Sequence, residues 1–233
     1  MRRPSGVMRR RLVRVCWQLV RLLKLRRHCL LVRRWPAERS GPRGHALLDV
    51  LVRRGCADAA GGGSVTDLIN FARLAMATIP GWTHTPRHDV IAEALALEAA
   101  ALATPALPAE RLIATGVVMS WRESNWFLRV HNGTLLGDGG RAYCLMQVHP
   151  NKVFAPHPQA LLGADLRATR ACFNAGLRAL VYHHRRCSLG DNGMIAGYMT
   201  GHACEGYGSK RVAMIREVLR KTRELAAERA KKQ

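Results

Sequence analysis

Long apolar segments are missing from this chain of 233 residues. No stretch approaches the roughly 20 apolar residues that a helix needs to cross a bilayer, so we expect no transmembrane helix. The first residues are basic, as in a secretory signal. However, the longest uncharged run among them, 15–20, is shorter than the roughly 7 to 15 apolar residues of a signal peptide. We therefore expect no export by an ordinary signal peptide.

Acidic residues are also scarce, with 16 Asp and Glu against 37 Lys and Arg and a formal net charge of +21. More than half of this excess lies in residues 1–60, whose only acids are Glu38, Asp49 and Asp58. Such a skew predicts a polyanionic partner, such as an anionic membrane or an anionic cell-wall polymer. Apart from charge, no nucleic-acid-binding module is recognisable, so we expect no specific nucleic acid partner.

The basic residues near the start of the chain alternate with apolar ones. Residues 9–35 interleave Arg and Lys with Leu, Val and Trp, and the spacing predicts a basic amphipathic helix that lies on an anionic membrane surface. The alternative is a leader that does not fold. Turn formers at 36–43 and a glycine-rich segment at 59–64 follow, which predicts a basic N-terminal extension, 1–63, ending in a flexible linker.

The rest of the chain is long enough for one domain of ordinary size. Apolar periodicity predicts helices at 67–78 and 87–103, a helical lead-in spanning 64–106, and a third helix from near Pro108. Residues 132–150 are rich in glycine and predict a small β or loop element beside a cleft. Helical patterns return from Asp165, at 194–201 and from about Lys210, before a basic tail at 223–233. The fold class we expect is α+β and mostly α.

Three short segments carry the chemistry. Glu123 and Ser124 end the third predicted helix within WRESNW, YCLMQVHP follows about 20 residues later, and AGYMTG lies further on. A carboxylic acid in aromatic, partly apolar surroundings has a raised pKa and can donate a proton near neutral pH. Breaking a glycosidic bond requires such an acid. Of Trp121 and Trp126, we expect at least one to pack in the core.

These segments, in this order and spacing, resemble the lysozyme-like lytic transglycosylase domain of the soluble lytic transglycosylase and goose-type lysozyme group. The resemblance covers roughly residues 107–220, within a domain that we place at 107–222. It implies a lysozyme-like fold, peptidoglycan glycan strands as the substrate, Glu123 as the catalytic acid/base, and no cofactor or metal. It also implies substrate-binding roles for Ser124, Met146, Gln147 and Tyr198.

The chain departs from the family pattern at two positions. Cys144 stands where the family has Gly, a residue favoured where φ is positive or a ligand comes close. Met199 stands where Asn is usual. These departures leave open a non-catalytic protein that binds glycan, or one that binds membranes through its basic extension.

The resemblance also implies a reaction type. In lytic transglycosylases one acid protonates the leaving oxygen and then accepts a proton from the muramic acid C6 hydroxyl, which closes a 1,6-anhydro ring. An inverting hydrolase would need a second carboxylate roughly 6.5 to 9.5 Å away. Asp138 is the only acid between Glu123 and Asp165, and its GDGG context is typical of a solvated turn. We therefore predict a lytic transglycosylase, with a lysozyme-type hydrolase as the alternative.

Peptidoglycan as a substrate implies the cell wall or periplasm as the site of action. Proteins associated with phages reach the wall through membrane holes or by injection, which would reconcile that site with a missing signal peptide. A phage-associated protein is therefore one of the origins we consider.

The seven cysteines are an odd number, so at least one has no partner within the monomer. In the predicted catalytic half we expect free buried thiols, with one disulfide among Cys172, Cys187 and Cys204 as the alternative. A metal site is a weaker alternative. Its candidate ligands would be His183, His184, Cys187, His202 and Cys204, which lack the paired spacing of zinc sites.

Overall fold

The computed structural model describes residues 64–151, 153–205 and 208–232, which all belong to one compact unit. The basic extension 1–63, including the predicted amphipathic helix at 9–35, lies outside the described residues. None of the helices in the described ranges is long and apolar enough to span a bilayer.

The described unit is built from helices. They are α4 (Val65–Ala77), α5 (Pro86–Leu102), α6 (Ala109–Ser124), α7 (Leu128–His131), the 3-10 helix η2 (Pro158–Leu161), α8 (Leu166–Arg186), α9 (Gly190–Thr200) and α10 (Ser209–Ala230). No strand forms in the ranges that the structure covers, and the mostly α part of the predicted fold class is confirmed. The element predicted at 132–150 is a loop held by isolated antiparallel bridges, Gly137 to Ala142 and Tyr143 to Val148.

Local sequence signals explain where the helices begin. Ser64 and Asp67 form a reciprocal capping box at the start of α4, which satisfies two of the free N–H groups of the first turn. Asp165 caps α8 by accepting a hydrogen bond from the Ala168 N–H at 3.0 Å. Pro86 occupies the first turn of α5, where its missing N–H removes no helical hydrogen bond. The predicted helix ends were accurate to within a few residues.

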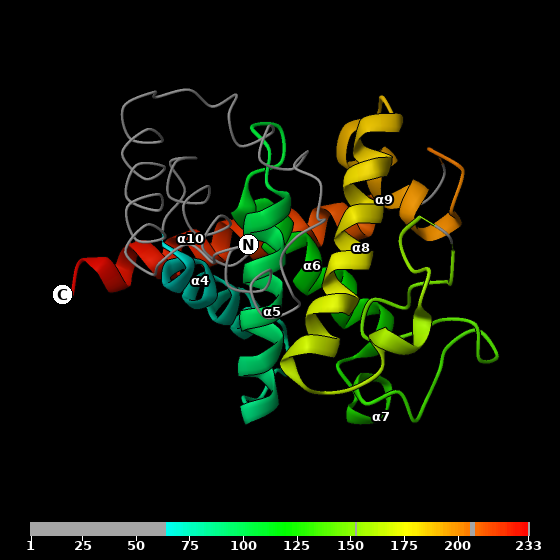
Figure 1. Cartoon of the computed structure of the whole chain (residues 1–233). Helices are drawn as coiled ribbons and strands as arrows, with labels where there is room; N and C mark the ends of the chain where they lie inside the picture. Colours follow the sequence, from blue (N-terminus) through cyan, green and yellow to red (C-terminus); the bar gives the residue numbers. More distant parts are fainter. Residues whose placement is uncertain (1–63, 152, 206–207, 233) are drawn as a thin grey trace, which may run out of the picture. The chain divides into compact units, whose positions relative to one another are not determined.

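The core lies between α5 and its neighbours. Helix α5 packs against α4, α6 and α8, while α10 crosses α4 and α6 and α9 packs on α8 (Figure 1). Gly116 of α6 permits close approach to α5, because a Cβ at this position would lie 2.5 Å from Leu95 Cδ1. The lead-in helices α4 and α5 therefore share one core with α6 and α8. Helix α10 continues through most of the predicted basic tail.

One buried polar cluster fixes α5 to α8. Glu98 is 3% exposed and accepts hydrogen bonds from Arg170 Nε at 2.8 Å and Asn174 Nδ2 at 2.7 Å. Both carboxylate oxygens are thus satisfied, as burial of the charge requires. This acid belongs to the scaffold.

Two disulfides join loops to α8. Cys144 bonds Cys172 within α8, and Cys204 bonds Cys187 at the end of the same helix. The expectation of free buried thiols in this half of the chain was therefore wrong. The partners come together because α8 lies alongside loops that are 28 and 17 residues away in sequence. The metal-site alternative loses both of its thiolate ligands, since Cys187 and Cys204 are bonded to each other.

Candidate active site

Glu123 lies in the last turn of α6 and lines a cavity of about 560 Å³. The walls come from the end of α6 and the residue Phe127, from Val130 of α7, from the loop residues 135–137, and from Gln147. The cavity therefore brings together the first two predicted segments, which are separated by about 20 residues in sequence.

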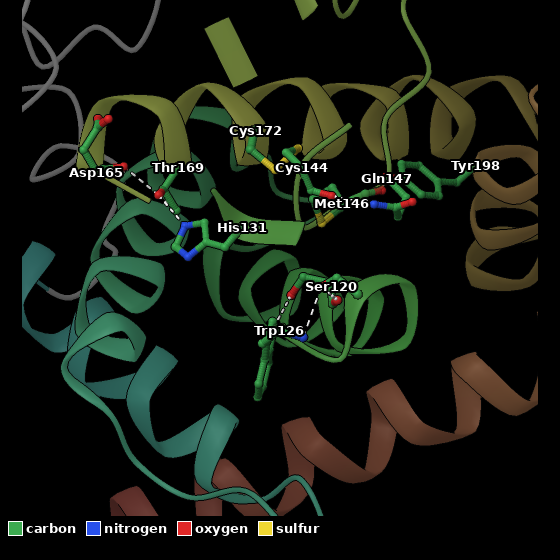
Figure 2. Close-up of a disulfide and its surroundings, with 11 residues drawn as sticks. Ser120, Trp126, His131, Cys144, Met146, Gln147, Asp165, Thr169, Cys172 and Tyr198 are labelled. Carbon is green, nitrogen blue, oxygen red and sulfur yellow. Dashed lines mark hydrogen bonds between the residues drawn. A yellow bond between two sulfur atoms is a disulfide. The ribbon is translucent and has the colours of Figure 1, made fainter. Parts of the chain in front are cut away.

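Helix α6 ends in an unusual backbone conformation. Asn125 and Trp126 both have positive φ, at 50° and 52°, which is rare for a residue as bulky as Trp. Two hydrogen bonds hold Trp126: its backbone N–H donates to Ser124 Oγ at 3.2 Å and its Nε1 donates to Ser120 Oγ at 2.9 Å (Figure 2). The chain therefore turns sharply after Glu123 and keeps it at the cavity wall.

Ser124 serves this turn. Its hydroxyl donates to the Ser120 carbonyl at 2.6 Å while accepting from the Trp126 N–H, and the residue is buried. Ser124 contributes to the cavity wall, but its hydroxyl is already engaged with the backbone. The observed role of Ser124 is therefore to cap the backbone, and its contact with substrate stays a prediction.

The aromatic residues around Glu123 divide into two groups. Trp126 is 3% exposed and packs edge-on to His88, which confirms that at least one tryptophan is a core residue. Trp121 and Phe127 line the cavity instead, and Phe127 is 58% exposed. Our sequence reasoning did not single out Phe127. Its position directly after the predicted helix end was the only signal available.

Burial dominates the electrostatics of Glu123. Burial raises the pKa of its carboxyl above the ordinary value, the charge of Arg211 lowers it, Asp138 raises it and Arg122 lowers it, with a net upward shift. Arg211 Nη2 lies 2.8 Å from Glu123 Oε1, and the two side chains are 17% and 23% exposed. The site thus favours the protonated carboxyl more than water does, even with a cation in contact.

The loop across the cavity has its own strained positions. Cys144 and Gln147 have φ of 59° and 50°, a conformation that glycine adopts more readily than other residues. Gln147 lines the cavity, and its Nε2 donates to the Cys144 carbonyl at 2.9 Å. Gly137 leaves room for this amide, because a Cβ there would lie 1.6 Å from Gln147 Oε1.

Met146 and Tyr198 support this loop from behind. The Met146 side chain is fully buried and packs against Gly176 of α8, where a Cβ would lie 2.7 Å from its Cε. Tyr198 of α9 donates its hydroxyl to the Met146 carbonyl at 2.6 Å (Figure 2). Burial raises the pKa of Tyr198, and the negative charge of Glu123 raises it further.

Only some of the predicted site residues line the cavity. Gln147 and Glu123 line the cavity, whereas Met146 and Tyr198 are not part of its lining. The Tyr198 hydroxyl donates to the loop backbone, and a contact of Tyr198 with substrate stays a prediction. Met199 is 41% exposed.

Asp138 does not line the cavity. It occupies a turn with φ of 46°, and its Oδ2 pairs with His149 Nε2 at 2.9 Å with both side chains more than half exposed. This matches the solvated turn that its sequence context predicts. Its influence on Glu123 is electrostatic.

Backbone strain is concentrated here. Within the described residues, every non-glycine residue with positive φ lies between 125 and 147: Asn125, Trp126, Asp138, Cys144 and Gln147. Such conformations cost about 1 to 3 kcal/mol each and persist where the surrounding structure enforces them, often at functional sites. The strained positions therefore lie directly after Glu123 and in the loop that carries Gln147.

Comparisons of this chain with protein-family models, with curated proteins and with solved structures gave no match. Any assignment of function to this cavity therefore depends on its residues and geometry.

Proposed function

We propose that this protein is a lytic transglycosylase that cleaves the β-1,4 bond between N-acetylmuramic acid and N-acetylglucosamine in peptidoglycan. The observation that carries this proposal is Glu123, a shielded carboxyl with a raised pKa that lines a 560 Å³ cavity. The three motif segments on which the family resemblance depends support the choice of substrate.

The proposed reaction uses one carboxyl group twice. Protonated Glu123 donates its proton to the leaving glycosidic oxygen as the bond from that oxygen to the muramic acid C1 breaks. The resulting carboxylate then accepts the proton of the C6 hydroxyl while that oxygen bonds to C1, which closes the 1,6-anhydro ring. Water is neither consumed nor required, and Glu123 ends the cycle protonated.

The content of the cavity favours this route over hydrolysis. In the described part of the chain, Glu123 is the sole carboxylate among the lining residues. Asp138, the loop acid available as a second catalytic carboxylate, is exposed and paired with His149. An inverting hydrolase needs a second carboxylate facing the opposite side of the sugar, and the lining does not supply one.

The rest of the lining suits a sugar chain. Trp121, Phe127 and Leu135 provide aromatic and apolar surface for the nonpolar faces of sugar rings. Gln147 provides an amide for hydroxyl or acetamido groups. A largely apolar site with a few polar groups is typical of ligand cavities. The net charge of +21 suits a substrate and neighbouring wall or membrane polymers that carry anionic groups.

Product analysis tests this proposal. Purified peptidoglycan sacculi are incubated with the protein, and the released muropeptides are identified by mass spectrometry. We expect 1,6-anhydro-muramic ends, which contain one water fewer than the reducing ends left by a hydrolase. Reducing ends would support the hydrolase alternative. Retention on sacculi without any release would support a non-catalytic glycan-binding protein.

A further inference from the structure

Arg211 was not part of any motif recognised in the sequence. It lies in the first turn of α10, and its guanidinium reaches across to the end of α6, where Nη2 is 2.8 Å from Glu123 Oε1. Both side chains are largely shielded from water, so the pair is weakly screened and geometrically defined. A mechanism with a single acid assigns no role to this cation.

We propose that Arg211 is a positioning residue that binds Oε1 of Glu123 and leaves Oε2 as the oxygen that carries the reacting proton. This inference depends on the proposed function and extends it, because it specifies how one carboxyl group is oriented for both proton transfers.

The chemistry of the guanidinium supports this assignment. Arginine stays protonated and only donates hydrogen bonds, so the carboxyl oxygen that lies 2.8 Å from its Nη2 is the oxygen on which negative charge is favoured and a proton disfavoured. The acidic proton of Glu123 therefore sits on Oε2. After that proton leaves, the carboxylate charge is stabilised by the ion pair already in place, which requires no reorganisation during the reaction.

The other charged groups near Glu123 cannot replace Arg211. Arg122, from the same helix, lies over the Trp121 ring at 5.5 Å. Asp138, from the loop, pairs with His149. On α9, the phenol of Tyr198 is neutral and donates to the loop backbone. Among the residues that the structure describes, Arg211 is the charged group in ion-pair contact with Glu123.

The guanidinium also lacks a competing acceptor. Its Nη1 is buried and has no hydrogen-bond partner in the described part of the chain. Within the described residues, the ion pair of Arg211 is the one with Glu123.

The matched control is a second bridge between the same two helices. Arg223 of α10 pairs with Glu110 of α6 at 2.8 Å, but both side chains are exposed and the pair lies away from the cavity lining. Arg211→Gln and Arg223→Gln each remove one cation from α10. Only the first removes it from Glu123.

The first measurement is the pH dependence of sacculus cleavage by the wild type and these variants. Loss of Arg211 removes a charge that lowers the pKa of Glu123, so the acid stays protonated to higher pH. We expect the high-pH limb of the profile to move to higher pH in Arg211→Gln, with kcat reduced about 10- to 100-fold by misplacement of the acid and KM little changed. Arg223→Gln should match the wild type.

The second measurement does not need activity. The side-chain carboxyl of Glu123 is titrated by NMR in ¹³C-glutamate-labelled protein without substrate, and its signal is assigned by its loss in Glu123→Gln. We expect a higher midpoint in Arg211→Gln, whereas Arg211→Lys, which keeps the charge but loses the planar guanidinium, should titrate near the wild type with a reduced kcat. If Arg211→Gln does not fold, as judged by circular dichroism, the kcat and the Glu123 titration of Arg211→Lys test the proposal instead.

The outcomes separate the two proposals. An active wild type whose pH profile and Glu123 midpoint are unchanged in Arg211→Gln would overturn the role of Arg211 alone. A wild type that cleaves nothing would overturn the proposed function, whatever the NMR titration gives. A folded Arg211→Lys variant with full kcat would also contradict the positioning role.

Discussion

The Cys144–Cys172 disulfide allows a sharp test of how the cavity loop is held. Cys144 has a φ of 59°, a conformation that glycine adopts freely and other residues adopt at a cost. The bond to Cys172 of α8 fixes the loop in spite of this cost. Two double variants lack the bond and differ only at position 144: Cys144→Gly with Cys172→Ala, and Cys144→Ala with Cys172→Ala.

The magnitudes follow from loop closure and backbone sterics. For a cross-link between residues 28 apart in sequence, the chain-entropy relation gives a loss of about 3.6 kcal/mol in the free energy of unfolding. Both double variants lack the bond, so this loss of stability applies equally to both. The left-handed conformation costs a non-glycine residue about 1 to 2 kcal/mol, partly offset by the greater flexibility of glycine in the unfolded chain. We therefore expect the Gly variant to be more stable than the Ala variant by about 1 kcal/mol.

Urea unfolding of both variants measures this difference. The control is removal of the second disulfide by Cys187→Ala with Cys204→Ala, for which the 17-residue separation gives a loss of about 3.1 kcal/mol by the same relation. Equal stability of the Gly and Ala variants would refute the argument from backbone conformation. We also expect the Gly variant to retain more sacculus cleavage, since Gln147 depends on the path of this loop.

Three further outcomes are expected. Burial, with the charges of Arg87 and His88, lowers the pKa of His131 to about 4 from about 6.5 in the unfolded chain. As pH falls from about 6.5 toward 4, the unfolded chain takes up a proton at His131 that the folded protein does not, and the free energy of unfolding falls by on the order of 3 kcal/mol. His131→Gln should therefore flatten the stability profile measured by urea unfolding in this range. The pKa of Glu123 is raised instead, so folding is weakened as pH rises through it, and Glu123→Gln should raise the Tm at neutral pH. Gly137→Ala should displace the Gln147 amide and lower cleavage about as much as Gln147→Ala, with no further loss when the two are combined; additive losses would contradict this contact.

The helical scaffold could be predicted because its signals are local. The Ser64 and Asp67 pair, Asp165 and the apolar periodicity of α6 act within one or two helical turns. Glu123 was also predictable as a helix-end residue, since its place in the chain fixes its place in α6. The choice between β and loop structure at 132–150 was left open, because a few bridges between glycine-rich turns produce no strand periodicity.

The parts that sequence reasoning missed depend on distant segments. Arg211 meets Glu123 only because α10 crosses α6, and the Tyr198 hydroxyl reaches the Met146 carbonyl across 52 positions. The Cys144–Cys172 disulfide likewise joins segments that are distant in sequence. No spacing rule predicts such contacts.

The central claim is that Glu123 acts as the acid on glycosidic bonds, and a matched pair of glutamines tests it most directly. Glu110 lies on the same helix, α6, and is exposed in its pair with Arg223. The initial rate of muropeptide release from purified sacculi is measured for the wild type, Glu123→Gln and Glu110→Gln, all verified as folded. We predict that Glu110→Gln matches the wild type and that Glu123→Gln is slower by about 100-fold or more. Equal rates for Glu123→Gln and the wild type would contradict the claim.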